Sequence, residues 1–483
     1  MTGRPLLERC KTAALVVLVA GSFALSARVW WGAAAMYRVP PREEEYYRVP
    51  ATAGRLEELR QLTMPSRVIL HFGGGSHSAF MPGVSGYATI WGGAAKILAA
   101  ADLSPSQLVS ARSDYVRGLR GQPAVELTFP LPLPVGLWAT LWRSRCNPHE
   151  AGPTTLTVDR ALIALYPQPA LYLRRAHGAG YITVELAAEA DAVLAELQAQ
   201  LEAMGKAHLS AYVELQSRPN LLVTDGIFVP ADPPRLGAIE ARPEPSSPDD
   251  LRRLFFPDVS IVRETRERDR AVIYNDGLYS LRVYRTGAVD YNVVGGAGGA
   301  GGGAGGGGGA AAMFDAQLAL MRAAEFVNFH GGWPSEAVLA GLDMPPFSPI
   351  AGEGDRYTAF FAYRFRGLPI VGGEGAIRVT LSAQGVEAYS RHVRAPARLA
   401  ANLAPVIPAA RVLDALEAGR DRLPAVAASL EDLYPGYLLP DLDDPSGILR
   451  PAWIAELGGG VRVYFDSATG EGQMWTGQEQ RPF

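Results

Sequence analysis

Cysteine and histidine are scarce in this sequence of 483 residues, and their scarcity excludes two kinds of structural support. The two cysteines, Cys10 and Cys146, are too few for a disulfide framework. No pair has the spacing C-x-x-C, and the seven histidines are scattered without the spacing of a zinc site. We therefore expect neither a structural metal nor thiol redox chemistry.

An excess of positive charge is also missing. Lys and Arg total 45 and Asp and Glu total 49, so the formal net charge is −4. Such a balance supplies no broad electrostatic footprint for a phosphate backbone. The sequence therefore excludes a nucleic-acid partner, while its apolar share of 48% is enough for several folded cores.

One long apolar run is present near the start of the chain. No charge interrupts Thr12–Ala27, and the run resumes after Arg28. A helix over Thr12–Trp31 would be about 30 Å long, which is enough to span the hydrocarbon core of a bilayer. The run predicts a transmembrane anchor at residues 12–37, with aromatic side chains at its outer end.

The charges that flank the run predict its orientation. Basic residues precede it and three glutamates follow it: Arg4, Arg9 and Lys11, then Glu43, Glu44 and Glu45. By the positive-inside rule, residues 1–11 lie in the cytoplasm and residues 38–54 tether an extracytoplasmic bulk to the cell membrane. The alternative is a signal peptide cleaved at Ala24–Ser26, but the apolar run continues past that site.

Small residues recur four positions apart within the predicted span. Ala20 and Ala24 form one pair, and Ser22 and Ser26 form another. In lipid, helices associate through close approach of their backbones, which small residues permit. These four residues are therefore candidate contacts with a partner helix.

Patterning beyond the tether predicts an α+β fold, mostly antiparallel, in about three extracytoplasmic domains. Short alternating strands, such as those around the Thr286–Gly287 turn, are interspersed with helical patterns. Helices are expected at 187–204 and 311–329, and the prolines at 130–134 are expected to break the pattern. The segment 241–248 is the clearest boundary, so the expected domains are residues 55–240, 249–396 and 397–483.

Residues 295–309 consist of twelve Gly and three Ala, which predicts a flexible insertion. The tract contains a literal G-x-G-x-x-G at Gly296–Gly301. A run with so many glycines satisfies that pattern by chance, and no βαβ unit with its acidic residue surrounds it. We therefore expect no nucleotide or other cofactor.

Two further groups of residues could carry chemistry. The segment His71–His77 places Ser76 beside a histidine, but no G-x-S-x-G elbow surrounds that serine. The aspartates at 441, 443 and 444 lack the glycine and the distal glutamate of a calcium loop. We expect polar turns at both places, and neither a catalytic residue nor a metal ligand.

The stretch Leu251–Tyr291 combines a phenylalanine-rich start with the elements D-x-S-x-V-R and Y-x-D-G and a strand that ends in tyrosine. The residues that carry these elements are Asp258, Ser260, Val262, Arg263, Tyr274, Asp276, Gly277 and Tyr291. Three further features match in order along the chain. They are the anchor with its aromatic pair, the strand–turn–strand Tyr357–Tyr389, and Pro451–Trp453 with its closing hairpin. Together these features resemble the YycH family.

The resemblance implies a non-enzymatic, membrane-anchored regulator of a sensor histidine kinase, in a two-component system that controls cell-wall metabolism. The partners it implies are a WalK/YycG-like kinase and a YycI-like sister protein, contacted through the span and the outer domains. It implies no catalytic residue and no cofactor. Two alternatives stay open: an extracytoplasmic binding module for peptide or cell-wall material, and a membrane-tethered hydrolase that uses His71, Ser76 or His77.

Overall fold

The chain divides into two units, Met1–Thr52 and Ala53–Phe483. A computed structural model describes residues 19, 53–146, 156–176, 180–205, 209–244, 247–268, 271–294, 315–344, 356–372, 375–400, 402–439, 447–476 and 479–482. Within these ranges, no helix is both long enough and apolar enough to cross a membrane. The small residues of the predicted anchor lie outside the described residues: Ala20, Ser22, Ala24 and Ser26.

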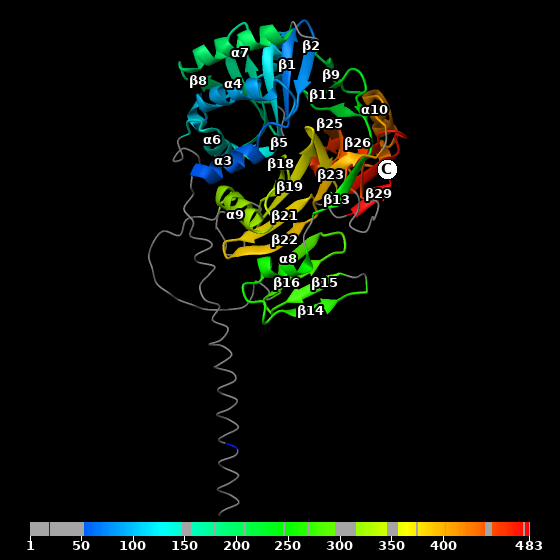
Figure 1. Ribbon diagram of the computed structural model, residues 1–483. Helices are drawn as coiled ribbons and strands as arrows, with labels where there is room; N and C mark the ends of the chain where they lie inside the picture. Colours follow the sequence, from blue (N-terminus) through cyan, green and yellow to red (C-terminus); the bar gives the residue numbers. More distant parts are fainter. Residues whose placement is uncertain are drawn as a thin grey trace, which may run out of the picture. The chain divides into compact units, whose positions relative to one another are not determined.

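Residues 67–230 build a ten-stranded antiparallel sheet, the first sheet, in the order β11-β9-β2-β1-β5-β6-β7-β8-β3, with β4 beside β8. Its strands are β1 (Arg67–Gly73), β2 (Ser76–Phe80), β3 (Ala101–Asp102), β4 (Val109–Ala111), β5 (Pro123–Pro134), β6 (Thr157–Ala164), β7 (Ala170–Arg175), β8 (Tyr181–Leu186), β9 (Tyr212–Glu214) and β11 (Phe228–Pro230). The helices of this segment are α3 (Ala53–Leu62), α4 (Tyr87–Ala99), α5 (Ser113–Leu119), α6 (Val135–Trp142) and α7 (Ala190–Gly205). Figure 1 shows α4 and α7 side by side, and both contact β1.

Strand β5 corrects the expectation that the prolines at 130–134 break the pattern. The strand continues through them to Pro134. Its register against β6 shifts between Thr128 and Leu133, and its pairing with β1 ends at Thr128. Pro130 and Pro132 therefore lie where the ladder is interrupted, and Pro134 is the last residue of the strand, opposite Thr157, so the missing N–H groups cost little. Leu131 and Leu133 alternate with them and are buried.

Residues 222–482 build the second sheet, which has seventeen strands. They are β10 (Leu222–Val223), β13 (Ile239–Pro243), β14 (Arg263–Arg266), β15 (Val272–Asn275), β16 (Tyr279–Val283), β17 (Val289–Val293), β18 (Ala337–Asp343), β19 (Tyr357–Phe365), β20 (Leu368–Val371), β21 (Ile377–Ser382), β22 (Gly385–Arg391), β23 (Arg394–Leu399), β25 (Ser429–Leu438), β26 (Ile448–Leu457), β27 (Val461–Asp466), β28 (Gly472–Thr476) and β29 (Glu479–Pro482). The pairs β10–β25 and β20–β25 are parallel and the other described pairs of strands in this sheet are antiparallel. The predicted α+β class with mostly antiparallel strands is confirmed.

Short elements complete this part of the chain. They are α8 (Pro248–Phe255), α9 (Ala316–Phe329), α10 (Ala409–Ala418), the ribbon of β12 (Arg235–Leu236) and β24 (Ala404–Pro405), and 3-10 turns at Pro105–Gln107, Arg420–Arg422 and Gly458–Gly460. Helix α9 begins where Asp315 Oδ1 accepts a hydrogen bond from Leu318 N at 2.8 Å, which is an N-cap. The predicted turn at Thr286–Gly287 joins β16 to β17, and Gly287 adopts a φ of 81° that favours glycine.

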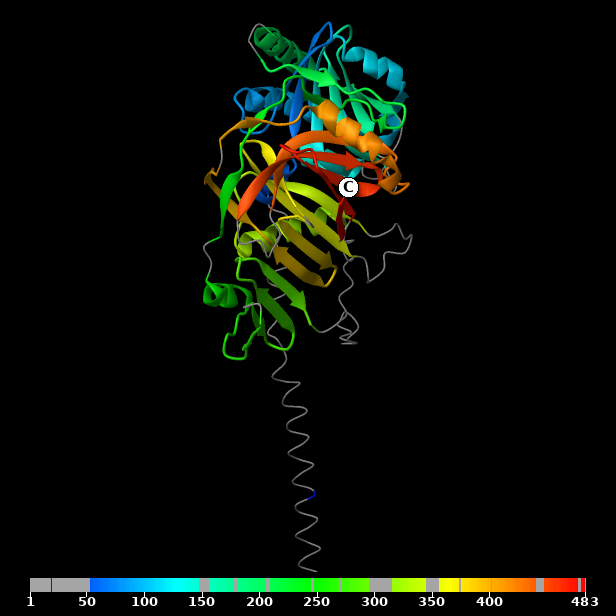
Figure 2. The ribbon, with the colours of Figure 1, turned by 90° about the vertical axis from the view of Figure 1, so that its right-hand side faces the viewer.

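Two large cores hold these layers together. The larger one contains buried residues of both sheets, from Leu59 to Leu449. The smaller one packs α10 against β25–β27 around Trp453. Figure 2 shows this C-terminal part of the chain, coloured orange and red, between the strands in blue and cyan and those in yellow and green. The predicted boundary at 241–248 runs from the end of β13 to the first residue of α8, and the division into three domains stays a prediction.

Candidate functional site between the two sheets

A buried ion pair joins the first sheet to the second. Arg67 of β1 places Nη2 2.5 Å from both carboxylate oxygens of Asp432 in β25, and both side chains are buried. Burial opposes the charge of Asp432, but the Arg67 guanidinium outweighs it and lowers the pKa of that carboxyl. The pair is therefore charged at neutral pH and holds β1 beside β25.

A second buried network is centred on Glu126 of β5. Arg120 donates two hydrogen bonds to its carboxylate, at 2.8 and 3.0 Å, and His71 Nε2 lies 3.3 Å from Oε2. Burial favours the neutral acid, yet the Arg120 guanidinium prevails and lowers the pKa of Glu126. His71 and Glu126 are fully buried, so this network stabilises the fold and does not face a substrate.

Gly226 packs directly against this network. Its φ is 78°, and its N–H donates to Glu214 Oε1 at 3.0 Å. A Cβ at this position would lie 2.5 Å from Arg120 Nη2 and 2.8 Å from Glu126 Oε1. Only glycine therefore lets this loop approach the buried charges.

The structure brings His71 and His77 together but leaves Ser76 apart. The two Nδ1 atoms are 2.9 Å from each other, across the β1–β2 pairing. Ser76 is exposed beside the three-glycine turn, and within the described ranges no hydrogen bond joins it to either imidazole. A hydrolase needs a nucleophile within reach of its base, so the geometry of this segment gives the hydrolase alternative no support.

Buried neutral histidines predict a loss of stability in mild acid. Burial lowers the pKa of His330 and His392 to about 4, and burial and the neighbouring His71 do the same for His77. The unfolded chain takes up these protons near pH 6.5, so stability is full above that value and falls as the pH drops towards 4. We expect the free energy of unfolding to fall by about 2 kcal/mol for each of His330 and His392 between pH 7 and pH 5.

Urea denaturation across this pH range measures the effect. His330 Nδ1 donates a hydrogen bond to Phe326 O at 2.8 Å, and the NH2 group of an asparagine amide can donate from the same place. The variant His330→Asn should therefore reduce the fall in the free energy of unfolding by about 2 kcal/mol, while His392 and His77 keep the rest of the pH dependence. A free energy that is constant between pH 7 and pH 5 in the unaltered protein would contradict the prediction.

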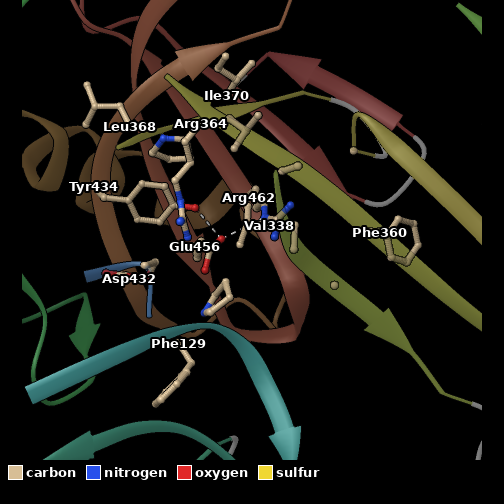
Figure 3. Close-up of a pocket in the computed structure, with 18 of the residues that line it drawn as sticks. Phe129, Val338, Phe360, Arg364, Leu368, Ile370, Asp432, Tyr434, Glu456 and Arg462 are labelled. Carbon is tan, nitrogen blue, oxygen red and sulfur yellow. Dashed lines mark hydrogen bonds and ion pairs between the residues drawn. The ribbon is translucent and has the colours of Figure 1, made fainter. Parts of the chain in front are cut away.

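A cavity of about 560 Å³ lies between the two sheets (Figure 3). One wall comes from β1, β5, β9 and β11, and the other comes from β18–β22 and β25–β27. Its apolar lining includes Phe129, Phe228, Phe360, Leu368 and Ile370. The volume lies in the range of small-molecule sites.

The polar side of the cavity is formed by β19 and β25–β27. The Tyr434 hydroxyl donates to Glu456 Oε1 at 2.8 Å, and Arg462 Nε lies 3.3 Å from the same oxygen, as Figure 3 shows. Arg364 of β19 lines the same cavity and is 7% exposed. Burial lowers its pKa, because desolvation penalises the guanidinium charge. The cavity can therefore receive a ligand with an apolar body and a polar end.

The family-motif residues at the two turns stabilise backbone geometry. Asp258 Oδ1 accepts from the Ser260 N–H at 2.9 Å and from its hydroxyl at 2.6 Å, ahead of β14. Asp276 Oδ1 accepts from Leu278 N and Tyr279 N at 2.9 and 2.7 Å, and Gly277 has a φ of 97° in the turn between β15 and β16. These side chains make the turns that pair the strands.

The other motif residues belong to the strands of the same region. Tyr274 and Tyr291 are buried, and Tyr291 stacks on Tyr279 with ring centroids 5.5 Å apart. Val262 is partly buried against the larger core, and Arg263 is exposed on β14. None of the motif residues lines the cavity within the described ranges. A role of these residues in partner binding stays a prediction.

The residues that line the cavity were not singled out by the sequence. The glycine tract 295–309 and the three aspartates at 441, 443 and 444 lie outside the described residues. The one available signal was Arg364, a lone charge inside the apolar strand Tyr357–Phe365. The pairing of Arg67 with Asp432 had no such signal, because an ion pair between residues 365 positions apart leaves no local spacing.

Of the comparisons with known proteins, only the one with solved structures found similar proteins. No protein-family model matches the chain, and no curated protein matches it. The crystal structure of YycH from Bacillus subtilis is similar with a TM-score of 0.52 and 13% identity, over 84% of this chain and 96% of that one. An uncharacterized protein from Eubacterium rectale is less similar, with a TM-score of 0.34 and 10% identity over 56% of this chain and 93% of that one. The chain therefore has the fold of YycH, as the resemblance of its sequence to the YycH family predicts.

Proposed function

We propose that this chain is a non-enzymatic, membrane-anchored regulator of a sensor histidine kinase of the WalK/YycG type, with its bulk outside the cytoplasm. The observation that carries the proposal is the YycH fold, which extends over 84% of the chain. The apolar run at residues 12–37 and the basic residues before it support the anchor and its orientation. A YycI-like sister protein is the second partner that we propose.

The proposed regulator acts by contact with its partners, and its anchor helix provides the first contact surface. At 100° per residue, Ala20 and Ala24 share one face of a helix, while Ser22 and Ser26 lie on the opposite face. Lipid removes the hydrophobic drive between helices, so each contact depends on small residues that let backbones approach. The two faces provide one surface for the kinase and one for the sister protein.

Enlarging one face should therefore weaken regulation without releasing the protein from the membrane. The double variant Ala20→Leu/Ala24→Leu stays apolar enough to insert, but its side chains hold a partner helix away. We expect a several-fold change in kinase-dependent reporter expression at equal membrane levels of the protein. Replacement of the whole span by an unrelated anchor should have the same effect.

The variant Ser22→Leu/Ser26→Leu adds the same bulk to the opposite face and so tests that second surface separately. If it changes the reporter while the alanine variant does not, the kinase contact lies on the serine face. Normal regulation in both double variants and in the swapped anchor would show that the span is a passive tether, and would move the contact to the outer domains.

The cavity favours a second candidate function, the binding of peptide or cell-wall material outside the cell. A pocket of about 560 Å³ with apolar walls and a polar side has the features of a ligand site. Such binding is compatible with regulation by contact.

A further inference from the structure

Arg364 is a buried cation that forms no ion pair within the described ranges: Glu336 attracts it electrostatically, but the Glu336 carboxylate accepts a hydrogen bond from Gly367 N instead. Arg364 lies in β19 opposite Pro369 of β20, and its side chain is 7% exposed. Its backbone N–H donates to Glu336 O at 3.2 Å, but its guanidinium has no hydrogen bond or ion pair with any residue of the described ranges. Desolvating a cation without a partner costs several kcal/mol.

The other charged groups of the cavity do not compensate for it. Four arginines and three carboxylates line the walls: Arg67, Arg364, Arg378 and Arg462, with Asp343, Asp432 and Glu456. Arg67 is neutralised by Asp432, and Arg462 faces Glu456. The wall therefore carries one positive charge in excess, which matches a ligand with a single negative charge.

The remaining surface is apolar and aromatic. Figure 3 shows Phe129 on the side of the first sheet and Val338, Leu368 and Ile370 among the strands of the second. Phe228 and Phe360 extend this lining. Apolar walls with one fixed polar group are typical of sites that hold the body of a ligand by burial and orient it by its charged end.

We propose that this cavity binds a small amphipathic carboxylate, whose carboxylate pairs with the Arg364 guanidinium and whose apolar body lies against Phe129, Phe228 and Phe360. A guanidinium presents parallel donors that match a carboxylate in a bidentate pair. The cost of burying Arg364 persists in the unliganded protein because the ligand, when bound, supplies the missing charge. The inference goes beyond kinase regulation and does not depend on it.

Matched acids and neutral analogues test the charge directly. The full chain in lipid nanodiscs is titrated calorimetrically with N-acetyl-leucyl-leucine and its C-terminal amide, and with octanoate and octanol, against empty nanodiscs. We expect the acid of at least one pair to bind about tenfold or more tightly than its neutral analogue, because a hydrogen bond to a charged group is lost. Binding of the peptide acid indicates a peptide C-terminus as the source, and binding of octanoate indicates a fatty acid.

The variant Arg364→Met tests the residue. It keeps the volume and removes the charge, so acid binding should weaken about tenfold or more, while the unfolding temperature without ligand should stay equal or rise. Arg366→Met is the matched control, because Arg366 is an exposed arginine two positions along and outside the cavity. It should bind the acid as the unaltered chain does.

Several results would overturn the inference. Equal affinity for acid and neutral analogue in both pairs, or no binding of either acid at millimolar concentration, would show that the cavity does not select a carboxylate. Undiminished acid binding by Arg364→Met would show that another residue, and not Arg364, pairs with the carboxylate of the ligand. A lower unfolding temperature of that variant would assign Arg364 a structural role. The comparison of each acid with its neutral analogue uses the unaltered chain, so it tests selectivity for a carboxylate even if the variant fails to fold.

Discussion

Replacing Asp432 with alanine should lower the free energy of unfolding by about 3–5 kcal/mol, because it leaves the buried Arg67 guanidinium without its partner. The pair also spans the two sheets, and Asp432 Oδ1 accepts from Leu433 N at 2.8 Å within β25. Urea denaturation followed by tryptophan fluorescence measures the change at pH 7, where the carboxylate is charged.

Two variants separate the buried charge from the mere loss of a side chain. The double replacement Arg67→Met/Asp432→Leu should recover most of the stability, since an apolar pair of similar volume avoids desolvation of both ions. Glu240→Ala removes the partner of Arg398 in an exposed pair and should change little. A loss in the double variant as large as in Asp432→Ala would show that packing, and not the uncompensated charge, dominates.

Replacing Glu126 with alanine should be equally damaging, again by about 3–5 kcal/mol. The carboxylate accepts two hydrogen bonds from Arg120 and lies beside His71, so its removal takes the main counter-charge from a buried guanidinium that keeps only Glu214 and Tyr181 as acceptors. The same denaturation experiment applies. The protein should unfold at a lower urea concentration, as followed by its near-ultraviolet circular dichroism.

Glu185→Ala is the matched control, because Glu185 lies on β8 of the same sheet and is exposed. It should leave the denaturation midpoint nearly unchanged. Gly226→Ala should fall between the two, since its added Cβ meets Arg120 Nη2 and its φ of 78° strains a residue with a side chain. Unchanged stability in Glu126→Ala would mean that the network rearranges around a water molecule and that its charge is dispensable.

Local patterning predicted much of the fold. The strand at 67–72 is β1, the helix at 187–204 is α7 with slightly shifted ends, and the hairpin around Gly287 has the predicted turn. Each of these follows from alternation, caps and turn residues within a few positions of the chain. Strand β5 was not predicted beyond residue 129, because a proline normally indicates the end of a strand. The sequence does not show that the pairing of β5 with β6 is interrupted at this place, where prolines are tolerated.

The residues of the candidate site, in contrast, could not be predicted from local patterning. Asp432 lies 365 positions from Arg67, and Arg160 Nη2 reaches the Glu431 carbonyl from 271 positions away. No periodicity of 2 or 3.6 residues encodes which strands of two different sheets face each other. The cavity exists because the sheets pack with a gap along part of their contact, and its lining therefore combines residues that lie far apart along the chain.

By itself, the sequence determined the absence of a disulfide framework, the α+β class and the family-motif residues, since these depend on composition and on short-range pattern. It also predicts the anchor at residues 12–37 through a run that is apolar regardless of its neighbours. The packing of the sheets, by contrast, buries the Arg364 guanidinium with no hydrogen bond or ion pair to the described residues, and it joins His71 to His77 without Ser76. Burial and pairing are properties of the packed sheets, because the free energy of a charge depends on which groups surround it in space.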